Sequence, residues 1–246
     1  ELLRPLPSVN KTIVVVGSHD NTLDILADEI RAKHSDITLS SSHVGSMGGL
    51  MAIKRGVCHL AGSHLLNSED GSYNVSYIEK LLPNKPVKLV NLVHREQGLI
   101  IPSGNPKNIK GIEDLGRDDI TFINRQGGSG TRILLDYRLS QLEIDPNTIT
   151  GYDNEEFTHM SVAVAVLSGI ADLGLGIYSA AKALNMDFIP VVTERYDLVI
   201  PDEHFNSDEI QKLLEIINSK EFKTRVAGLG GYSTEQTGDI IYGSTV

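Results

Sequence analysis

The sequence is poor in cysteine, in aromatic residues and in positive charge. Among 246 residues it has one cysteine, Cys58, and no tryptophan, and aromatic residues make up 5%. A single cysteine excludes a framework of internal disulfides. Lysine and arginine together number 22 against 32 aspartate and glutamate residues, so the formal net charge is −10. This balance argues against a surface that binds nucleic acid or an anionic membrane directly.

Two further absences concern the chain as a whole. No apolar stretch is long enough to cross a membrane as a helix. The first residues, ELLRPLPSVNK, contain neither an initiator methionine nor a signal-peptide pattern. We interpret the chain as a fragment of a longer protein that begins in a Pro-containing linker, although a processed secreted protein would share both features.

What the chain does contain is a regular alternation of strand-like and helix-like segments. TIVVVGS is typical of a buried strand, and the apolar residues of NTLDILADEIRAKH recur at helical spacing. Similar pairs follow along the chain, which ends in two helix-like runs, SDEIQKLLEIINS and KEFKTRVAGL. This alternation predicts an α/β fold with mostly parallel sheets flanked by helices. The length allows one large or two small domains.

Two long extended segments, near residues 87–101 and 188–201, interrupt the alternation. Each carries charged residues in its middle. Strands that cross between two lobes would have this pattern. We therefore predict a discontinuous first lobe, residues 1–93 plus 200–246, and a second lobe of residues 95–198.

A glycine-rich turn joins a strand-like run to a helix-like run in NRQGGSGTRILLDYRL, residues 124–139. It does not match a phosphate-binding loop, the dinucleotide pattern or a nucleophile elbow. Two interpretations remain. The turn is an anion site of hydroxyls, backbone N–H groups and arginine, or it is only a helix start capped by a serine. Its candidate binding residues are Arg125, Ser129, Gly130, Thr131 and Arg132, of which the last could instead face the solvent.

Metal binding and catalysis have little support in the sequence. The histidines and Cys58 are scattered along the chain without a recurring metal-ligand spacing. His19 and Asp20 stand near several serines, but adjacent side chains point in different directions and nothing marks an activated nucleophile. We therefore expect no metal, no cofactor and no catalytic residue.

Six stretches carry a resemblance to a known family: GSMGGLMAIKRG, HLAGSHLLNSEDGSYNV, LVNLVHREQGLIIPSGNPKNI, FINRQGGSGTRILLD, EEFTHMSVAVAVLSGIADLGLGI and RYDLVIP. Over nearly its whole length the chain resembles the type II periplasmic-binding-protein fold, as used in molybdate and tungstate transport and in LysR-type regulators. It is most similar to the MoeA/LysR substrate-binding-like domain. That domain is cytoplasmic and is fused to molybdopterin-biosynthesis proteins or to DNA-binding helix-turn-helix modules.

The resemblance implies two lobes with a ligand in the cleft between them, near the carboxyl ends of parallel strands. It implies a cytoplasmic, non-catalytic domain that captures a small anion, with molybdate or tungstate favoured. Hinge closure would pass the binding event to the fused module. Two alternatives stay open: a sensor of an organic effector, such as a pterin-like or carboxylate metabolite, and a catalytic domain acting on molybdopterin.

Under this resemblance, polar residues at several strand ends and helix starts are expected to face the ligand. Arg95, on the first long segment, could pair either with an anion or with an acidic residue of the other lobe. Some candidates have a structural alternative as helix caps, and Asp20 or Asn21 is the stronger cap for the first helix. The expected binding residues outside the glycine-rich turn are Ser18, His19, Gly45, Ser46, His64, Gln97, Thr158, His159 and Tyr178.

Overall fold

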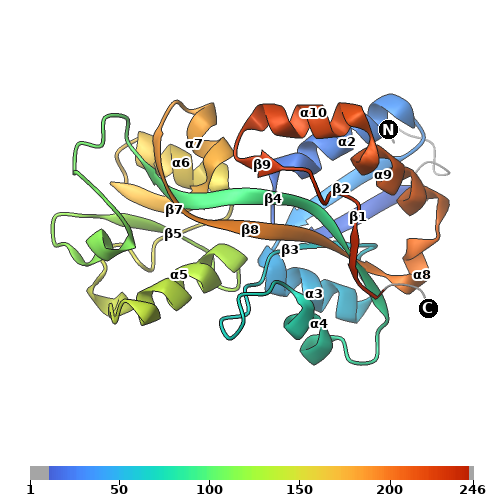
Figure 1. The fold of residues 1–246 in the computed structure, drawn as a ribbon, viewed down its shortest axis with the longest axis horizontal. Helices are drawn as coiled ribbons and strands as arrows, with labels where there is room; N and C mark the ends of the chain where they lie inside the picture. The colour runs from blue at the N-terminus through green and yellow to red at the C-terminus, as the bar shows by residue number, and fades with distance from the viewer. Residues whose placement is uncertain (1–10, 244–246) are drawn as a thin grey trace, which may run out of the picture.

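Two long strands run through the whole molecule and join its two lobes (Figure 1). In the computed structural model, which describes residues 11–243, these are β4 (Val87–Ile101) and β8 (Asp187–Pro201). They pair antiparallel along their full length. The two extended segments are therefore the crossover strands of a two-lobed α/β fold, as predicted. The Pro-containing start, residues 1–10, lies outside the described residues, and so do residues 244–246.

The first lobe is built on the parallel pair β1–β2 and on β3, which pairs with β8. Its elements are, in chain order, β1 (Thr12–Gly17), α2 (Asn21–Lys33), β2 (Thr38–His43), α3 (Gly45–Arg55), β3 (Ala61–Ser63) and α4 (Val75–Leu81).

The second lobe is built on β5, which pairs in parallel with β6 and β7. Strand β7 also pairs antiparallel with β4, so the crossover strands make the larger sheet mixed. Its elements are η1 (Ile112–Gly116), β5 (Phe122–Arg125), α5 (Gly130–Gln141), η2 (Pro146–Thr148), β6 (Glu155–Glu156), α6 (His159–Leu167), β7 (Leu173–Ile177) and α7 (Tyr178–Ala183).

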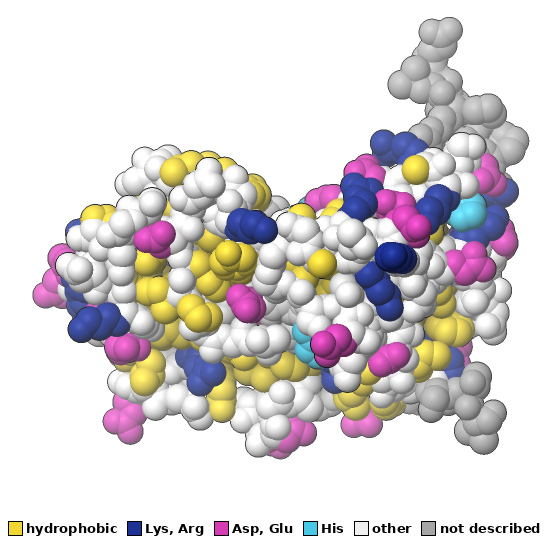
Figure 2. Space-filling model, turned by 45° about the horizontal axis from the view of Figure 1, so that its top comes forward, with side chains coloured by type: hydrophobic (Ala, Val, Ile, Leu, Met, Phe, Trp, Pro, Cys, Tyr) yellow, Lys and Arg dark blue, Asp and Glu magenta, His cyan; other side chains and the backbone are white. Residues whose placement is uncertain are grey.

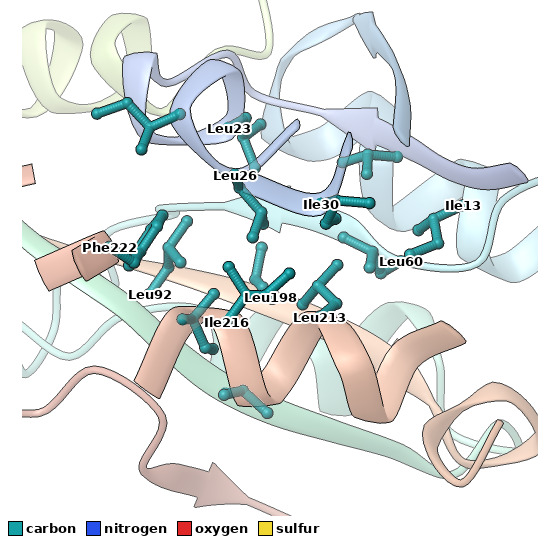
Figure 3. Packing of buried hydrophobic residues seen from close by; sticks show 14 of the residues in the cluster. Ile13, Leu23, Leu26, Ile30, Leu60, Leu92, Leu198, Leu213, Ile216 and Phe222 are labelled. Carbon is teal, nitrogen blue, oxygen red and sulfur yellow. The ribbon is translucent and has the colours of Figure 1, made fainter. Parts of the chain in front are cut away.

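After β8 the chain returns to the first lobe. The returning elements are α8 (Asp202–Phe205), α9 (Asp208–Asn218), α10 (Lys220–Leu229), β9 (Tyr232–Ser233) and β10 (Ile240–Tyr242). Figure 3 shows Leu23, Leu26 and Ile30 of α2 facing Leu213 and Ile216 of α9 across one hydrophobic core. Burying each such side chain stabilises the fold by about 1.5–3 kcal/mol. A separate core fills the second lobe. The exact lobe boundaries stay a prediction.

Candidate functional site

The two lobes touch each other at the N-termini of helices. The N–H of Met47 in α3 donates to the carbonyl of Gly128, just before α5, at 3.3 Å. Gly45 has a φ of 78°, which favours glycine. A Cβ at Gly130 would lie 2.5 Å from Nδ1 of His64, so only glycine allows α5 to pack this closely on the first lobe. The residues between the lobes are therefore enclosed.

Side-chain caps fix the helix starts around this boundary. Asp20 accepts the N–H of Thr22 at 2.7 Å and caps α2. Ser129 accepts the N–H of Arg132 at 3.2 Å and caps α5, so the capping interpretation of the glycine-rich turn is correct in part. Thr158 caps α6 in the same way. Ser129 has a hydroxyl proton left to donate, because a hydroxyl that accepts a bond can still give one.

A chain of three buried polar side chains runs across the first lobe and β8. The Ser18 hydroxyl lies 2.8 Å from Nε2 of His64, and Nδ1 of His64 lies 2.9 Å from Oε2 of Glu194. The hydroxyl of Ser46 holds His64 by accepting its backbone N–H at 3.2 Å. Tyr196 stacks on the ring and donates its hydroxyl to the carbonyl of Ser18 at 2.6 Å. The alignment of hydroxyl, imidazole and carboxylate is therefore rigidly held.

Arg95 forms ion pairs with two buried carboxylates, Asp20 and Glu194. Its Nε donates to Oε1 of Glu194 at 2.7 Å, and its Nη1 to Oδ2 of Asp20 at 2.5 Å. Burial alone raises the pKa of Glu194, but His64 and Arg95 outweigh it and lower the pKa to about 2. Of the two roles open to Arg95, the structure shows the pairing with acidic side chains. Gln97 completes this network by donating to Thr131 and to Glu194, each at 3.3 Å.

Arg125 is the other buried arginine, and its charge is unpaired. Its Nε donates to the carbonyl of Glu156 at 3.1 Å and its Nη2 to the carbonyl of Phe157 at 3.0 Å. Its Nη1 has no hydrogen-bond partner within the described chain, and the hydrogen bonds that its side chain makes there go to carbonyl and amide oxygens, not to a carboxylate. Burial, and then the charge of Arg95, lower the pKa of Arg125 to about 9, so it remains a cation at neutral pH.

His159 lies beside Arg125 at the start of α6. It is wholly buried, and neither of its ring nitrogens has a hydrogen-bond partner among residues 11–243. Burial, and then the charges of Arg125 and Arg95, lower its pKa well below the ordinary value, which keeps the ring neutral. His64 and His19 lower the pKa of this ring further. We call these five side chains, together with Asp20 and Glu194, which pair with Arg95, the buried cluster. Nδ1 of His19 and Oε1 of Gln97 are buried without a partner as well.

Two of the candidate residues lie apart from this cluster. Arg132 pairs with Asp136 at 3.2 Å and with Glu155 at 3.3 Å, and its guanidinium lies over the ring of Tyr152. These partners all belong to the second lobe. Tyr178 packs its ring edge-to-face on Phe188 and lies against the backbone of the loop before β9. These contacts do not involve the side chains of the buried cluster, although Nη1 of Arg132 also donates to the backbone carbonyl of Arg125 at 3.5 Å.

The remaining candidates lie in or around the cluster, where their role as ligand contacts stays a prediction. The residues that sequence reasoning missed are Glu194 and Asp20, both of which bind Arg95. A signal was present for Glu194, because a carboxylate in the middle of a long strand needs a partner when it is buried.

No helix in the described part of the chain is long and apolar enough to span a membrane. Nor do residues 11–243 contain a group of three or more His, Cys, Asp or Glu side chains placed to hold a metal ion. On the face seen in Figure 2, acidic and basic side chains are interspersed, so the net negative charge does not form a single patch there.

Comparison with known proteins agrees with this architecture. The family model of the PBP superfamily domain matches residues 27–218, so the chain belongs to the PBP superfamily. The uncharacterized protein YvgK of Bacillus subtilis (strain 168) is 37% identical over 228 residues, which cover 93% of this chain and 73% of that protein.

Two solved structures share the fold. The tungstate ABC transporter from Geobacter sulfurreducens matches with a TM-score of 0.62 and 16% identity, over 89% of this chain and 99% of that chain. An ABC-type phosphate transport receptor from Vibrio cholerae matches with a TM-score of 0.56 and 16% identity, over 89% of this chain and 98% of that chain. At such low identity the likeness concerns the fold alone, and it confirms the two-lobed periplasmic-binding-protein-like class.

Proposed function

We propose that this chain is a non-catalytic binding domain that captures a small oxyanion between its lobes, with molybdate or tungstate as the favoured ligand. The observation that carries the proposal is the buried, unpaired charge of Arg125. A buried charge without a partner is strongly destabilising, so buried charges in proteins are almost always paired. An anion held against Nη1 would supply the missing partner through a charge-assisted hydrogen bond.

The surroundings of Arg125 suit a tetrahedral oxyanion. Ser18, Ser129 and Thr131 are buried and bring hydroxyl groups from both lobes. The N-termini of α3 and α5 meet at the lobe boundary, and unpaired N–H groups at helix starts favour negative charge. The fold shared with proteins of tungstate and phosphate transport adds support of a general kind.

An organic effector is the second candidate ligand, and His159 favours it. A neutral imidazole has one donor and one acceptor nitrogen, and both are unpartnered here. A proton-free oxyanion satisfies only the donor. A ligand with both a donor and an acceptor, such as a pterin-like or carboxylate metabolite, would satisfy both nitrogens.

A catalytic role has one observation in its favour, because Ser18, His64 and Glu194 align as the members of a hydrolytic triad do. The binding proposals expect no turnover, either of a nitrophenyl ester or of a molybdopterin intermediate. Turnover that disappears in Ser18→Ala would replace them with the catalytic alternative.

The biological setting of the proposal follows the resemblance seen in the sequence. We place the chain in the MoeA/LysR substrate-binding-like group, in the cytoplasm, as part of a longer protein. Its fused module would be a molybdopterin-biosynthesis protein or a helix-turn-helix regulator, to which closure of the lobes passes the signal.

The direct test is calorimetric titration of the chain with molybdate, tungstate, phosphate and sulfate, followed by thermal unfolding. A ligand that binds only the folded form at about a hundredfold excess over Kd adds about 2.7 kcal/mol to the free energy of unfolding. For a chain of this size the Tm should rise by about 5–10 °C. If no oxyanion binds but an organic metabolite does, the effector sensor replaces the oxyanion proposal.

A further inference from the structure

The contact between Ser18 and His64 determines whether the Ser18 hydroxyl can donate a hydrogen bond to an anion. The two atoms lie 2.8 Å apart, and both are buried. At that distance one proton must lie between them, because two facing lone pairs repel. Which of the two atoms supplies that proton decides what Ser18 can offer to a ligand.

With a neutral His64, the proton of the ring belongs on Nδ1. Nδ1 lies 2.9 Å from the carboxylate of Glu194, which can only accept. Nε2 is then an acceptor, so the Ser18 hydroxyl must donate its proton to the ring. In this state Ser18 presents only lone pairs to a ligand, and lone pairs repel an anion.

With a doubly protonated His64, the pattern reverses. Nδ1 still donates to Glu194, and Nε2 now donates to the oxygen of Ser18. The hydroxyl proton of Ser18 is released and can turn toward an anion. The hydroxyl is therefore a donor to the ligand only when the imidazole carries its second proton.

The charges of the cluster favour the same state. Two buried arginines, Arg95 and Arg125, stand against two buried carboxylates, Asp20 and Glu194, so these four charges sum to zero. A dianion that enters the cluster adds two negative charges, and one proton on His64 removes half of that excess. Inside a protein, where the effective dielectric constant is low, this difference is large.

We propose that capture of a fully ionised oxyanion is coupled to the uptake of one proton from solvent by His64, and that Glu194 is the positioning residue that fixes this proton. The inference rests on the proposed function and narrows its ligand class: the ligand binds as the fully ionised anion, and the proton taken up stays on His64. Burial keeps His64 neutral before binding by lowering its pKa.

Several charged or titratable side chains face His64 from the elements packed around it. Glu194 raises its proton affinity, whereas Arg95 and Arg125 lower it. The element α5 brings Gly130, which has no charge, against the ring. The groups that share the ring's surroundings are Glu194 and Tyr196 of β8, Arg95 of β4, Arg125 of β5, His19 and Asp20 before α2, and His159 of α6.

The experiment is titration calorimetry with molybdate in buffers that differ in ionisation enthalpy, at about pH 8, where the unbound imidazole is neutral. We expect an uptake of close to one proton per molybdate bound. Affinity should fall as the pH rises, by up to about tenfold per unit, because the bound state holds more protons. Nitrogen chemical shifts of the His64 ring should change from those of a neutral to those of a charged imidazole on binding.

Two variants locate the proton. His64→Gln places an amide donor near Ser18 without a titrating group, so it should bind molybdate with no proton uptake. His43→Gln removes another histidine near the cluster, which packs on His19 but does not contact Ser18, and should leave the uptake unchanged. Binding without uptake in the native chain overturns this inference and leaves the proposed function standing. Uptake that persists in His64→Gln also overturns it, and failure to bind any oxyanion overturns both proposals.

Discussion

Arg95 and Arg125 lie on neighbouring parts of the same buried cluster, and their surroundings differ in one respect. Each is 1% exposed, but Arg95 has two carboxylates as partners and Arg125 has only carbonyl and amide oxygens. The carboxylates raise the pKa of Arg95 above its usual value despite burial, whereas burial and Arg95 lower that of Arg125 to about 9. Arg95 thus stabilises the fold through its carboxylate partners, whereas the charge of Arg125 is available to bind an anion.

This difference predicts that replacing the two arginines will change stability by very different amounts. Arg95→Met leaves Asp20 and Glu194 buried without a cation, and breaking a buried ion pair in this way typically costs about 3–5 kcal/mol. Arg125→Met leaves no carboxylate behind. It removes the hydrogen bonds to the carbonyls of Glu156 and Phe157, but it also removes an unpaired buried charge, so the two effects offset each other and the free energy of unfolding should change by less than about 1 kcal/mol. Urea unfolding of both variants without oxyanion measures the contrast. Equal losses in the two variants would contradict the division of roles.

Low pH should destabilise the fold by protonating Glu194, which pairs with Arg95 and His64. The folded pKa of Glu194 is lowered from 4.5 to about 2 by His64 and Arg95, against burial. A carboxylate with a lowered folded pKa contributes stability above its unfolded pKa and loses it as the pH falls toward the folded one. The contribution, roughly 3 kcal/mol, should therefore be complete above about pH 4.5 and lost progressively down to about pH 2.

Unfolding followed over this acid range measures the loss. Glu194→Gln is the comparison, because an amide does not titrate and its stability should fall less steeply below about pH 4.5. If the native chain and the variant lose stability in parallel there, the carboxylate of Glu194 is not what Arg95 stabilises.

The fold could be predicted from the sequence because it depends on local patterns of residues, and one such pattern drew attention to the glycine-rich turn. The spacing of apolar residues predicts the strands and helices. The two long strands β4 and β8 were predicted because their segments interrupt the alternation of strand-like and helix-like runs. The turn RQGGSGT marked Arg125, Ser129 and Thr131 because glycine and hydroxyl residues before a helix either bind an anion or cap the helix. These three side chains are buried, and their contact with a ligand stays a prediction.

The ion pairs of the buried cluster could not be predicted from local patterns. Arg95 and Glu194 are 99 positions apart, and no local pattern reports which of many acidic residues an arginine contacts. Arg125 and Arg132 flank one turn, and the sequence left open whether Arg132 faces the site or the solvent. In the structure β5 directs Arg125 into the cluster, and the first turn of α5 directs Arg132 toward Asp136. The direction of a side chain depends on the tertiary packing around it, which a single sequence does not show.

Replacing Arg125 should weaken molybdate binding much more than replacing Arg132, the other arginine of the glycine-rich turn. Arg125→Met removes the charge-assisted hydrogen bond expected to the oxyanion, which typically contributes about 1.5–3 kcal/mol, so the Kd for molybdate should rise by roughly ten- to a hundredfold. Calorimetric titration measures the change, and a circular dichroism spectrum like that of the native chain shows that the fold is kept. An unchanged Kd would assign the site to neutral donors alone.

Arg132→Ala is the matched control and should have the smallest effect on molybdate binding. Its guanidinium bridges Asp136 and Glu155 at the edge of the second lobe, where the carboxylate side chains are 46% and 37% exposed. Each of the two ion pairs with such exposed partners contributes about 0–1 kcal/mol, and the contact with Tyr152 adds about 0.5–1 kcal/mol. Stability should therefore fall by no more than about 3 kcal/mol in urea unfolding. Because these contacts lie outside the buried cluster, the Kd for molybdate should stay within about twofold of the native value. A loss of affinity as large as that of Arg125→Met would mean that Arg132 leaves its partners when the oxyanion binds, and the contrast between the two arginines would then describe only the unbound domain.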